Sequence, residues 1–417
     1  MNQTFYRYRK TLGPGILFAC TAIGVSHLVQ STRAGAEFGF LLLGFIILAN
    51  VMKYPFFEHG SRYANATGTS IIDGYEKLGR KFLILYLAIT VASMFFVTAA
   101  VGFVTAGFME NLFQIELPGV WAVVILFAIC ATILSVGRYS ALDGLLKVVG
   151  FILIISTILA FILALNNGPV EQIDNFVPRE LWNDSGIFFL IALMGWMPTA
   201  IDLSSWNSLW TIARIKQTGF KPLLKETIRE FRVAYIITSI LAIMFLTLGT
   251  YVFFGSGEEL PNNNSMFAHQ IVTLFTETIG EWSYIVIAAS AFSVMFGTIV
   301  AVFDGYSRSL SKVVQIIRHG DDERGFKKRY IILVMILAVG SIIVVFQFGE
   351  KLKELVDFAT TVSFLVAPVI AIFNYRLVTG KYLAREAKPP GWIKVLSVMG
   401  IAFLIGFALF FVYTKFF

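Results

Sequence analysis

The chain has 417 residues, of which 57% are hydrophobic and only 14% are charged, and its formal net charge is +7. Because a soluble domain usually carries about 25% charged residues, this composition indicates a polytopic membrane protein. The two cysteines, Cys20 and Cys130, lie inside apolar runs, so neither a disulfide framework nor a cysteine metal site is expected.

A membrane-spanning helix needs about 20 mostly apolar residues. Lys and Arg gather in alternate loops of the chain, whereas the other loops are acidic or neutral. This alternation favours membrane orientation over nucleic-acid binding as the role of the basic residues, and places the N-terminus in the cytoplasm and the C-terminus outside. We therefore predict a multi-pass, all-α protein of the plasma (inner) membrane, one domain over 1–417, with eleven spans at about 12–36, 38–62, 81–109, 119–137, 142–166, 185–213, 231–255, 282–306, 329–348, 355–378 and 391–416.

The first and the sixth spans carry polar clusters and Gly or Pro at their centres, TAIGVSHLVQS and MGWMPTAIDLSS. Interrupted segments at matching positions of two halves are typical of secondary transporters built from inverted repeats. We expect repeats over about 12–166 and 185–378, followed by an extra helix at 391–416. Backbone groups freed at mid-membrane need protein or a wet cavity around them, so the two breaks predict a substrate site. The alternative is a pair of kinked helices whose polar groups only bond to neighbours.

Three motifs resemble the Nramp family: GPG at the start of the first span, RAGAEFG at its end, and the Met-Pro break of the sixth span. That family consists of proton-coupled transporters of manganese, iron and related divalent metals, so the resemblance, which covers most of the chain, implies a LeuT-type 5+5 inverted repeat with helices 1 and 6 broken. The family's chemical motifs do not match. Its Asp-Pro-Gly-Asn is replaced here by Gly24, Val25, Ser26 and His27, and its Met-Pro-His-Asn by Met197, Pro198, Thr199 and Ala200.

The absence of the family's metal-binding Asp favours an anion as substrate. Broken helices direct backbone N–H groups and positive dipole ends toward the cavity. Ser26, Thr199 and Gln30 supply neutral donors, and His27 is a candidate for proton coupling. The spacing of His27 and Gln30 places them on one helical face. We predict transport of a small inorganic or carboxylate anion, bicarbonate-like in size, at a site made of Gly24, Val25, Ser26, His27, Gln30, Met197, Pro198, Thr199, Ala200 and Asp202.

A divalent metal cation of the Mn, Fe or Mg type is the alternative substrate. Such an ion normally needs at least one carboxylate and further oxygen, nitrogen or sulfur ligands. Asp202 lies three residues after Thr199 and is expected on the same helical face. His27, Met197 and Asp202 form the candidate metal set.

Coupling to Na⁺ or H⁺ is expected, with no bound cofactor. The eighth span carries Ser290, Ser293 and Thr298, whose hydroxyls are positioned to complete a sodium shell with carbonyls of the first span. The alternative is that they bond to their own preceding turn. The chain lacks HExxH and paired-Asp motifs, so an enzyme is not expected. The predicted partners are the small ion and the lipid bilayer, with no nucleic acid, and a monomer is expected.

Overall fold

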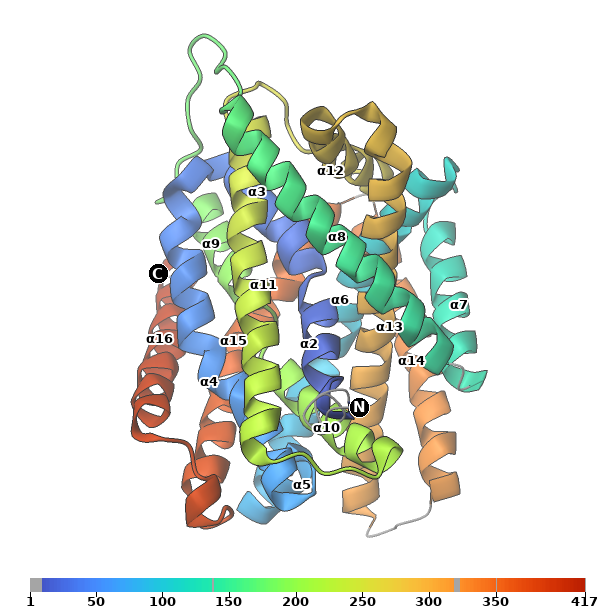
Figure 1. Cartoon of the computed structure of the whole chain (residues 1–417), viewed down its shortest axis with the longest axis vertical. Helices are drawn as coiled ribbons and strands as arrows, with labels where there is room; N and C mark the ends of the chain where they lie inside the picture. The colour runs from blue at the N-terminus through green and yellow to red at the C-terminus, as the bar shows by residue number, and fades with distance from the viewer. Residues whose placement is uncertain (1–9, 137–138, 319–322, 350, 417) are drawn as a thin grey trace, which may run out of the picture.

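The computed structural model describes residues 10–136, 139–318, 323–349 and 351–416, and all the regular structure in these ranges is helical (Figure 1). The N-terminal residues 1–9, part of the basis for the predicted orientation, lie outside the described residues. The long helices are α4 (Leu43–Thr67), α6 (Arg80–Phe113), α7 (Trp121–Val136), α8 (Tyr139–Asn167), α11 (Leu224–Phe253), α13 (Tyr284–Ile317), α14 (Glu323–Phe348), α15 (Leu352–Thr379) and α16 (Gly391–Phe416).

The first and the sixth spans are broken, as the sequence predicts. The first consists of α2 (Pro14–Ala22), a π-helix η1 (Ser26–Ser31) and α3 (Thr32–Phe38). The sixth consists of α9 (Asp184–Trp196) and α10 (Leu203–Thr218), and residues 197–202 between them are not helical. Together with the nine long helices, these two broken spans account for the eleven predicted spans within the described residues. The predicted limits of the two repeats stay a prediction.

Length and composition identify the chain as a multi-pass membrane protein. Within the described residues, seven helices are long and apolar enough to cross a membrane, and three shorter helical segments are strongly apolar. Two short helices, α5 (Ile71–Leu78) and α12 (Asn264–Ile279), are not among the predicted spans. These helices lie at opposite ends of the bundle in Figure 1, which we call the α5 end and the α12 end.

The first span is packed closely against α11. A Cβ atom on Gly35 would overlap the backbone carbonyl of Leu246, and one on Gly249 would overlap the carbonyl of Thr32. Small residues at such crossings let two helix backbones approach in a membrane, where lipid gives no hydrophobic drive for association. The two glycines therefore fix the position of α3 in the bundle.

The GPG motif at the start of α2 is explained by a carboxylate. Glu230 of α11 accepts hydrogen bonds from the backbone N–H groups of Gly13 (3.1 Å) and Gly15 (2.9 Å). A Cβ on Gly15 would lie 2.7 Å from this carboxylate, so a larger residue there would require the Glu230 side chain to shift. A negative group at a helix N-terminus satisfies orphan donors and complements the helix dipole. Glu230 therefore fastens the beginning of α2 to α11.

η3 (Glu281–Ser283), η2 (Gly39–Leu42) and η4 (Arg385–Ala387) are short 3₁₀ turns. The first two lead directly into α13 and α4, and the third precedes α16. They serve as connections and carry none of the candidate site residues.

Candidate functional site

A small cavity of about 30 Å³ lies between the two helix breaks. That volume is about the share of one water molecule in the liquid, so the cavity fits a water or a small ion. Its lining comes from α2, η1, α6, α9, α10, α13 and the two breaks: Thr21, Val25, Ser26, Val97, Val101, Trp196, Thr199, Ala200, Leu203, Trp206, Thr298, Val302 and Tyr306. None of these side chains is acidic.

Four of the predicted site residues line this cavity, two from each break: Val25, Ser26, Thr199 and Ala200. Gly24 lies beside it, where a Cβ would come within 2.8 Å of the Thr298 side chain. The other predicted residues are absent from its lining. The cavity therefore joins the two breaks through a subset of the expected residues.

His27 faces away from the cavity. Its ring is completely buried, and Nε2 donates to the carbonyl of Thr238 on α11 over 2.8 Å, because a carbonyl oxygen only accepts. Nδ1 lies 2.9 Å from the hydroxyl of Ser26, which in turn lies 2.5 Å from the carbonyl of Ala22. The imidazole thus links the first break to α11 in this conformation.

Gln30 and Arg33 turn toward α15 instead. The Gln30 amide donates to Asp357 over 2.9 Å, and Arg33 donates to both carboxylate oxygens of Asp357 over 2.7 and 3.1 Å. Arg33 also pairs with Glu37, four residues later in the chain, at 3.3 Å. The expected single polar face of His27 and Gln30 is not formed, because residues 26–31 make a π-helix, whose wider turn changes the spacing.

In the sixth break, Met197 and Asp202 likewise contact different parts of the bundle. Met197 directs its sulfur toward the hydroxyl of Ser31, 3.8 Å away. Asp202 accepts a hydrogen bond from the Tyr306 hydroxyl over 3.4 Å. Asp202 and Thr199 do not share a helical face, because α10 begins only at Leu203. The structure does not bring His27, Met197 and Asp202 together, and its described residues contain no group of three His, Cys, Asp or Glu that could hold a metal.

Lys53, which was not among the predicted site residues, lies inside α4 and has no exposed surface. Its ammonium donates to the carbonyls of Met194 (3.0 Å), Gly195 (2.9 Å) and Thr199 (2.9 Å) at the break of the sixth span. The signal was a lysine in the middle of the apolar run IILANVMKYPFF. An ionisable residue at that depth is a functional candidate by default.

Of the three hydroxyls proposed for the coupling ion, Thr298 is the one placed against the first span. Its hydroxyl is 3.1 Å from the Cys20 carbonyl and 3.0 Å from the Val294 carbonyl of its own helix. Ser290 bonds to the carbonyl of Val286 in its preceding turn over 2.7 Å, and Ser293 is half-buried on α13. Thr298 therefore joins the cavity lining to a first-span carbonyl.

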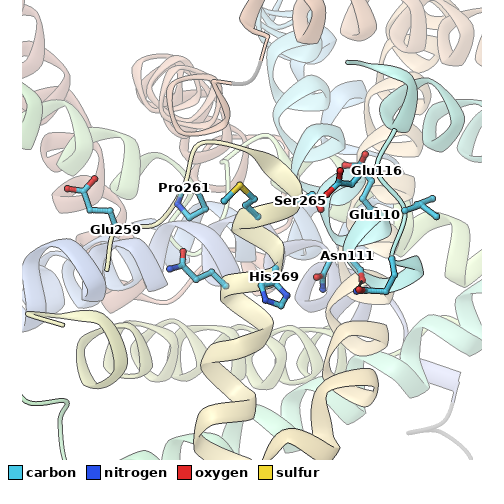
Figure 2. Close-up of a pocket in the computed structure, with 11 residues that line it drawn as sticks. Glu110, Asn111, Glu116, Glu259, Pro261, Ser265 and His269 are labelled. Carbon is cyan, nitrogen blue, oxygen red and sulfur yellow. Dashed lines mark hydrogen bonds between the residues drawn. The ribbon is translucent and has the colours of Figure 1, made fainter. Parts of the chain in front are cut away.

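A larger pocket of about 560 Å³ opens where the end of α6 meets α12 (Figure 2). Glu110, Glu116 and Glu259 line it together with His269. Glu110 accepts hydrogen bonds from the backbone of Leu117 and from Asn264, so it ties the α6–α7 loop to α12. The pocket shares no lining residue with the central cavity.

The sequence matches the family described as natural resistance-associated macrophage protein-like, Nramp, over residues 15–414. An uncharacterized protein of Pasteurella multocida (strain Pm70) is 34% identical over 414 residues, which span 99% of this chain and 94% of that protein. The manganese transporter of Eremococcus coleocola superposes with a TM-score of 0.71 at 15% identity, over 98% of this chain and 87% of that chain. MhsT in complex with L-phenylalanine superposes with a TM-score of 0.61 at 15% identity, over 96% and 98% of the two chains. At such low identity these two structures establish the LeuT-type fold alone.

Proposed function

Because the chain belongs to the Nramp family, whose members are membrane transporters and not enzymes, we propose that it moves a small divalent metal cation by secondary active transport. The family match over residues 15–414 carries this proposal. It also favours a metal over the bicarbonate-like anion expected from the sequence. The two breaks and the small cavity between them are the geometry that alternating access around a fixed site requires.

In the proposed site, the ion enters the cavity between the breaks and is held by oxygen atoms from both. Ser26 and Thr199 contribute hydroxyls at the cavity wall. Asp202, three residues after Thr199, is the carboxylate within the sixth break. For it to bind the ion directly, together with His27 and Met197, those side chains must leave their present partners Tyr306, Thr238 and Ser31. Gly24, Val25, Gln30, Pro198 and Ala200 complete the proposed site.

A small anion is the second candidate substrate, and one observation favours it. The cavity has no acidic side chain in its lining, and the ammonium of Lys53 is bound to the carbonyl of Thr199, a lining residue. A buried positive charge beside a small neutral cavity favours an anion electrostatically.

We also propose coupling to Na⁺ or H⁺, with Thr298 and the Cys20 carbonyl as the contact between α13 and the first span that a sodium ion would use. The plasma membrane, a cytoplasmic N-terminus, an outer C-terminus and a monomeric state are part of the same proposal. They rest on the alternating loop charges and on the single broken-helix bundle within one chain.

Uptake into proteoliposomes tests the substrate. One set of vesicles holds a manganese-sensitive dye, and the other holds a pH dye with bicarbonate outside, each with and without a sodium gradient. Manganese entry that exceeds the rate in protein-free vesicles supports the proposal. Manganese exclusion together with bicarbonate-dependent alkalinisation overturns it and establishes the anion instead.

A further inference from the structure

In broken-helix transporters, unwound backbone carbonyls and the C-terminal ends of half-helices coordinate coupling cations, and the ammonium of Lys53 binds carbonyls of this kind. The ammonium reaches from α4 to the C-terminal end of α9. Three backbone carbonyls, those of Met194, Gly195 and Thr199, accept its hydrogen bonds over 2.9–3.0 Å. An ammonium group has three donors and no acceptor, so these contacts use all its donors.

The break explains why these carbonyls are available. The last four carbonyls of a helix have no partner within it, and they carry the negative end of the helix dipole. α9 ends at Trp196, and residues 197–202 are not helical, so the one backbone donor that this described stretch directs to the three carbonyls is the N–H of Met197, 3.4 Å from the Met194 carbonyl. In a membrane these oxygens must find a partner inside the protein. Met194 and Gly195 in the last turn, and Thr199 in the break, find Lys53.

Backbone carbonyls that converge on one cation are also the ligands that free metal ions use. Calcium and sodium sites commonly contain carbonyl oxygens, and a transition metal accepts them together with a carboxylate. Asp202, the last residue of the same break, supplies a carboxylate three residues after Thr199 in the sequence. The break thus combines a carboxylate with three carbonyls, and the carbonyls already bind a cation that is covalently part of the chain.

We propose that Lys53 is a specificity-determining residue: its ammonium is an internal cation that occupies the carbonyl ligands of the sixth-span break and competes with a divalent cation for them. This proposal rests on the proposed function, because it assumes that the transported ion binds at the same break. A transported metal gains these oxygens only when the lysine releases them, so Lys53 lowers the affinity for divalent cations in the conformation described here.

The test compares Mn²⁺ binding to purified full-length protein, measured by isothermal titration calorimetry, in the wild type and in Lys53→Met. The substitution keeps the length of the side chain and removes the charge and the donors. We expect Mn²⁺ to bind the variant with a Kd at least tenfold lower than in the wild type. Lys351→Met is the matched control, because Lys351 is exposed and pairs with Glu354 at the start of α15; its Kd should equal that of the wild type.

An unchanged Kd in folded Lys53→Met overturns the proposal. If that variant does not fold, Lys53→Gln replaces it, since its amide can still donate to two of the three carbonyls without a charge, and the same tenfold expectation applies. If Lys53→Met and Lys53→Gln both fail to fold while Lys53→Arg folds, a cation is required at the break, which supports the proposal that the Lys53 ammonium occupies its carbonyl ligands. Failure of Lys53→Arg as well counts against it, because the position would then depend on shape rather than charge.

Uptake of Mn²⁺ into vesicles separates this proposal from the proposed function. Uptake by the wild type with no change in Lys53→Met refutes the role of Lys53 and leaves metal transport standing. No uptake by the wild type but clear uptake by Lys53→Met refutes metal transport as the native function and retains Lys53 as the residue that excludes the metal.

Discussion

The buried ion pair between Arg33 and Asp357 joins the first span to α15, and its loss should be among the more damaging single changes in the bundle. Arg33 is 2% exposed, and the ring of Phe189 lies 4.8 Å from its guanidinium carbon. Asp357 accepts two hydrogen bonds from Arg33 and one from Gln30. Asp357→Asn keeps the shape of the side chain and leaves the guanidinium without this counter-charge.

Removing one partner of a buried ion pair costs about 3–5 kcal/mol, because the remaining charge stays desolvated. Arg33 retains Glu37 at 3.3 Å, so we expect the lower limit, about 3 kcal/mol. The control is Glu354→Gln, three residues earlier on α15, where both side chains of the pair with Lys351 are more than half exposed. Exposed helical pairs contribute about 0.3–0.5 kcal/mol.

Reversible denaturation in detergent, followed by tryptophan fluorescence, measures the difference. The free energy of unfolding should fall several times further for Asp357→Asn than for Glu354→Gln. The double variant Arg33→Gln/Asp357→Asn should lose less than the sum of the two single variants, because it removes both charges together. Equal losses for Asp357→Asn and Glu354→Gln, or strictly additive losses, would refute the assignment of this pair as a buried and coupled contact.

Two further substitutions test the packing and the coupling contact. Gly249→Ala places a Cβ against the Thr32 carbonyl where α11 crosses α3, and we expect the free energy of unfolding to fall by about 1–3 kcal/mol from overpacking. The control is Gly406→Ala in α16, where nothing lies within 4 Å of the added atom, and it should be neutral or slightly stabilising in the same denaturation assay. Equal effects of the two substitutions would contradict the close crossing. Thr298→Val keeps the side-chain volume but removes the hydroxyl that reaches the Cys20 carbonyl, so uptake by this variant should lose its dependence on sodium. Ser290→Ala removes only a hydrogen bond to its own helical turn, so uptake should keep that dependence. Uptake by Thr298→Val that still follows a sodium gradient would exclude Thr298 from coupling.

Apolar length, loop charge and the two interrupted spans were sufficient to predict the number of spans and the two breaks. These features follow from the membrane itself, which requires about 20 apolar residues per helix and a partner for every freed backbone group. The helices α5 and α12 were not predicted, since a short helix at the end of a bundle needs neither a run of about 20 apolar residues nor an interruption at mid-membrane.

The side-chain directions at the breaks were not predictable from spacing. Helical periodicity assumed a regular α-helix through His27 and Gln30, and the π-helix there sends one ring to α11 and the other side chain to α15. Asp202 was paired with Thr199 on a helix that begins one residue later. Lys53 was not predicted as a site residue, because its three carbonyl partners are about 140 residues away in the sequence and no local pattern indicates them.

The attachment of the first span to α11 has a consequence for movement. Glu230 holds the start of α2, while the crossing at Gly249 holds α3. Between positions 230 and 249, α11 rises about 28 Å, at about 1.5 Å per residue, which is close to the thickness of the hydrocarbon layer. One continuous helix, α11, therefore supports both halves of the broken first span. Opening the α5 end by tilting α2 must first detach Glu230 from Gly13 and Gly15, whereas tilting the first span together with α11 leaves these bonds intact.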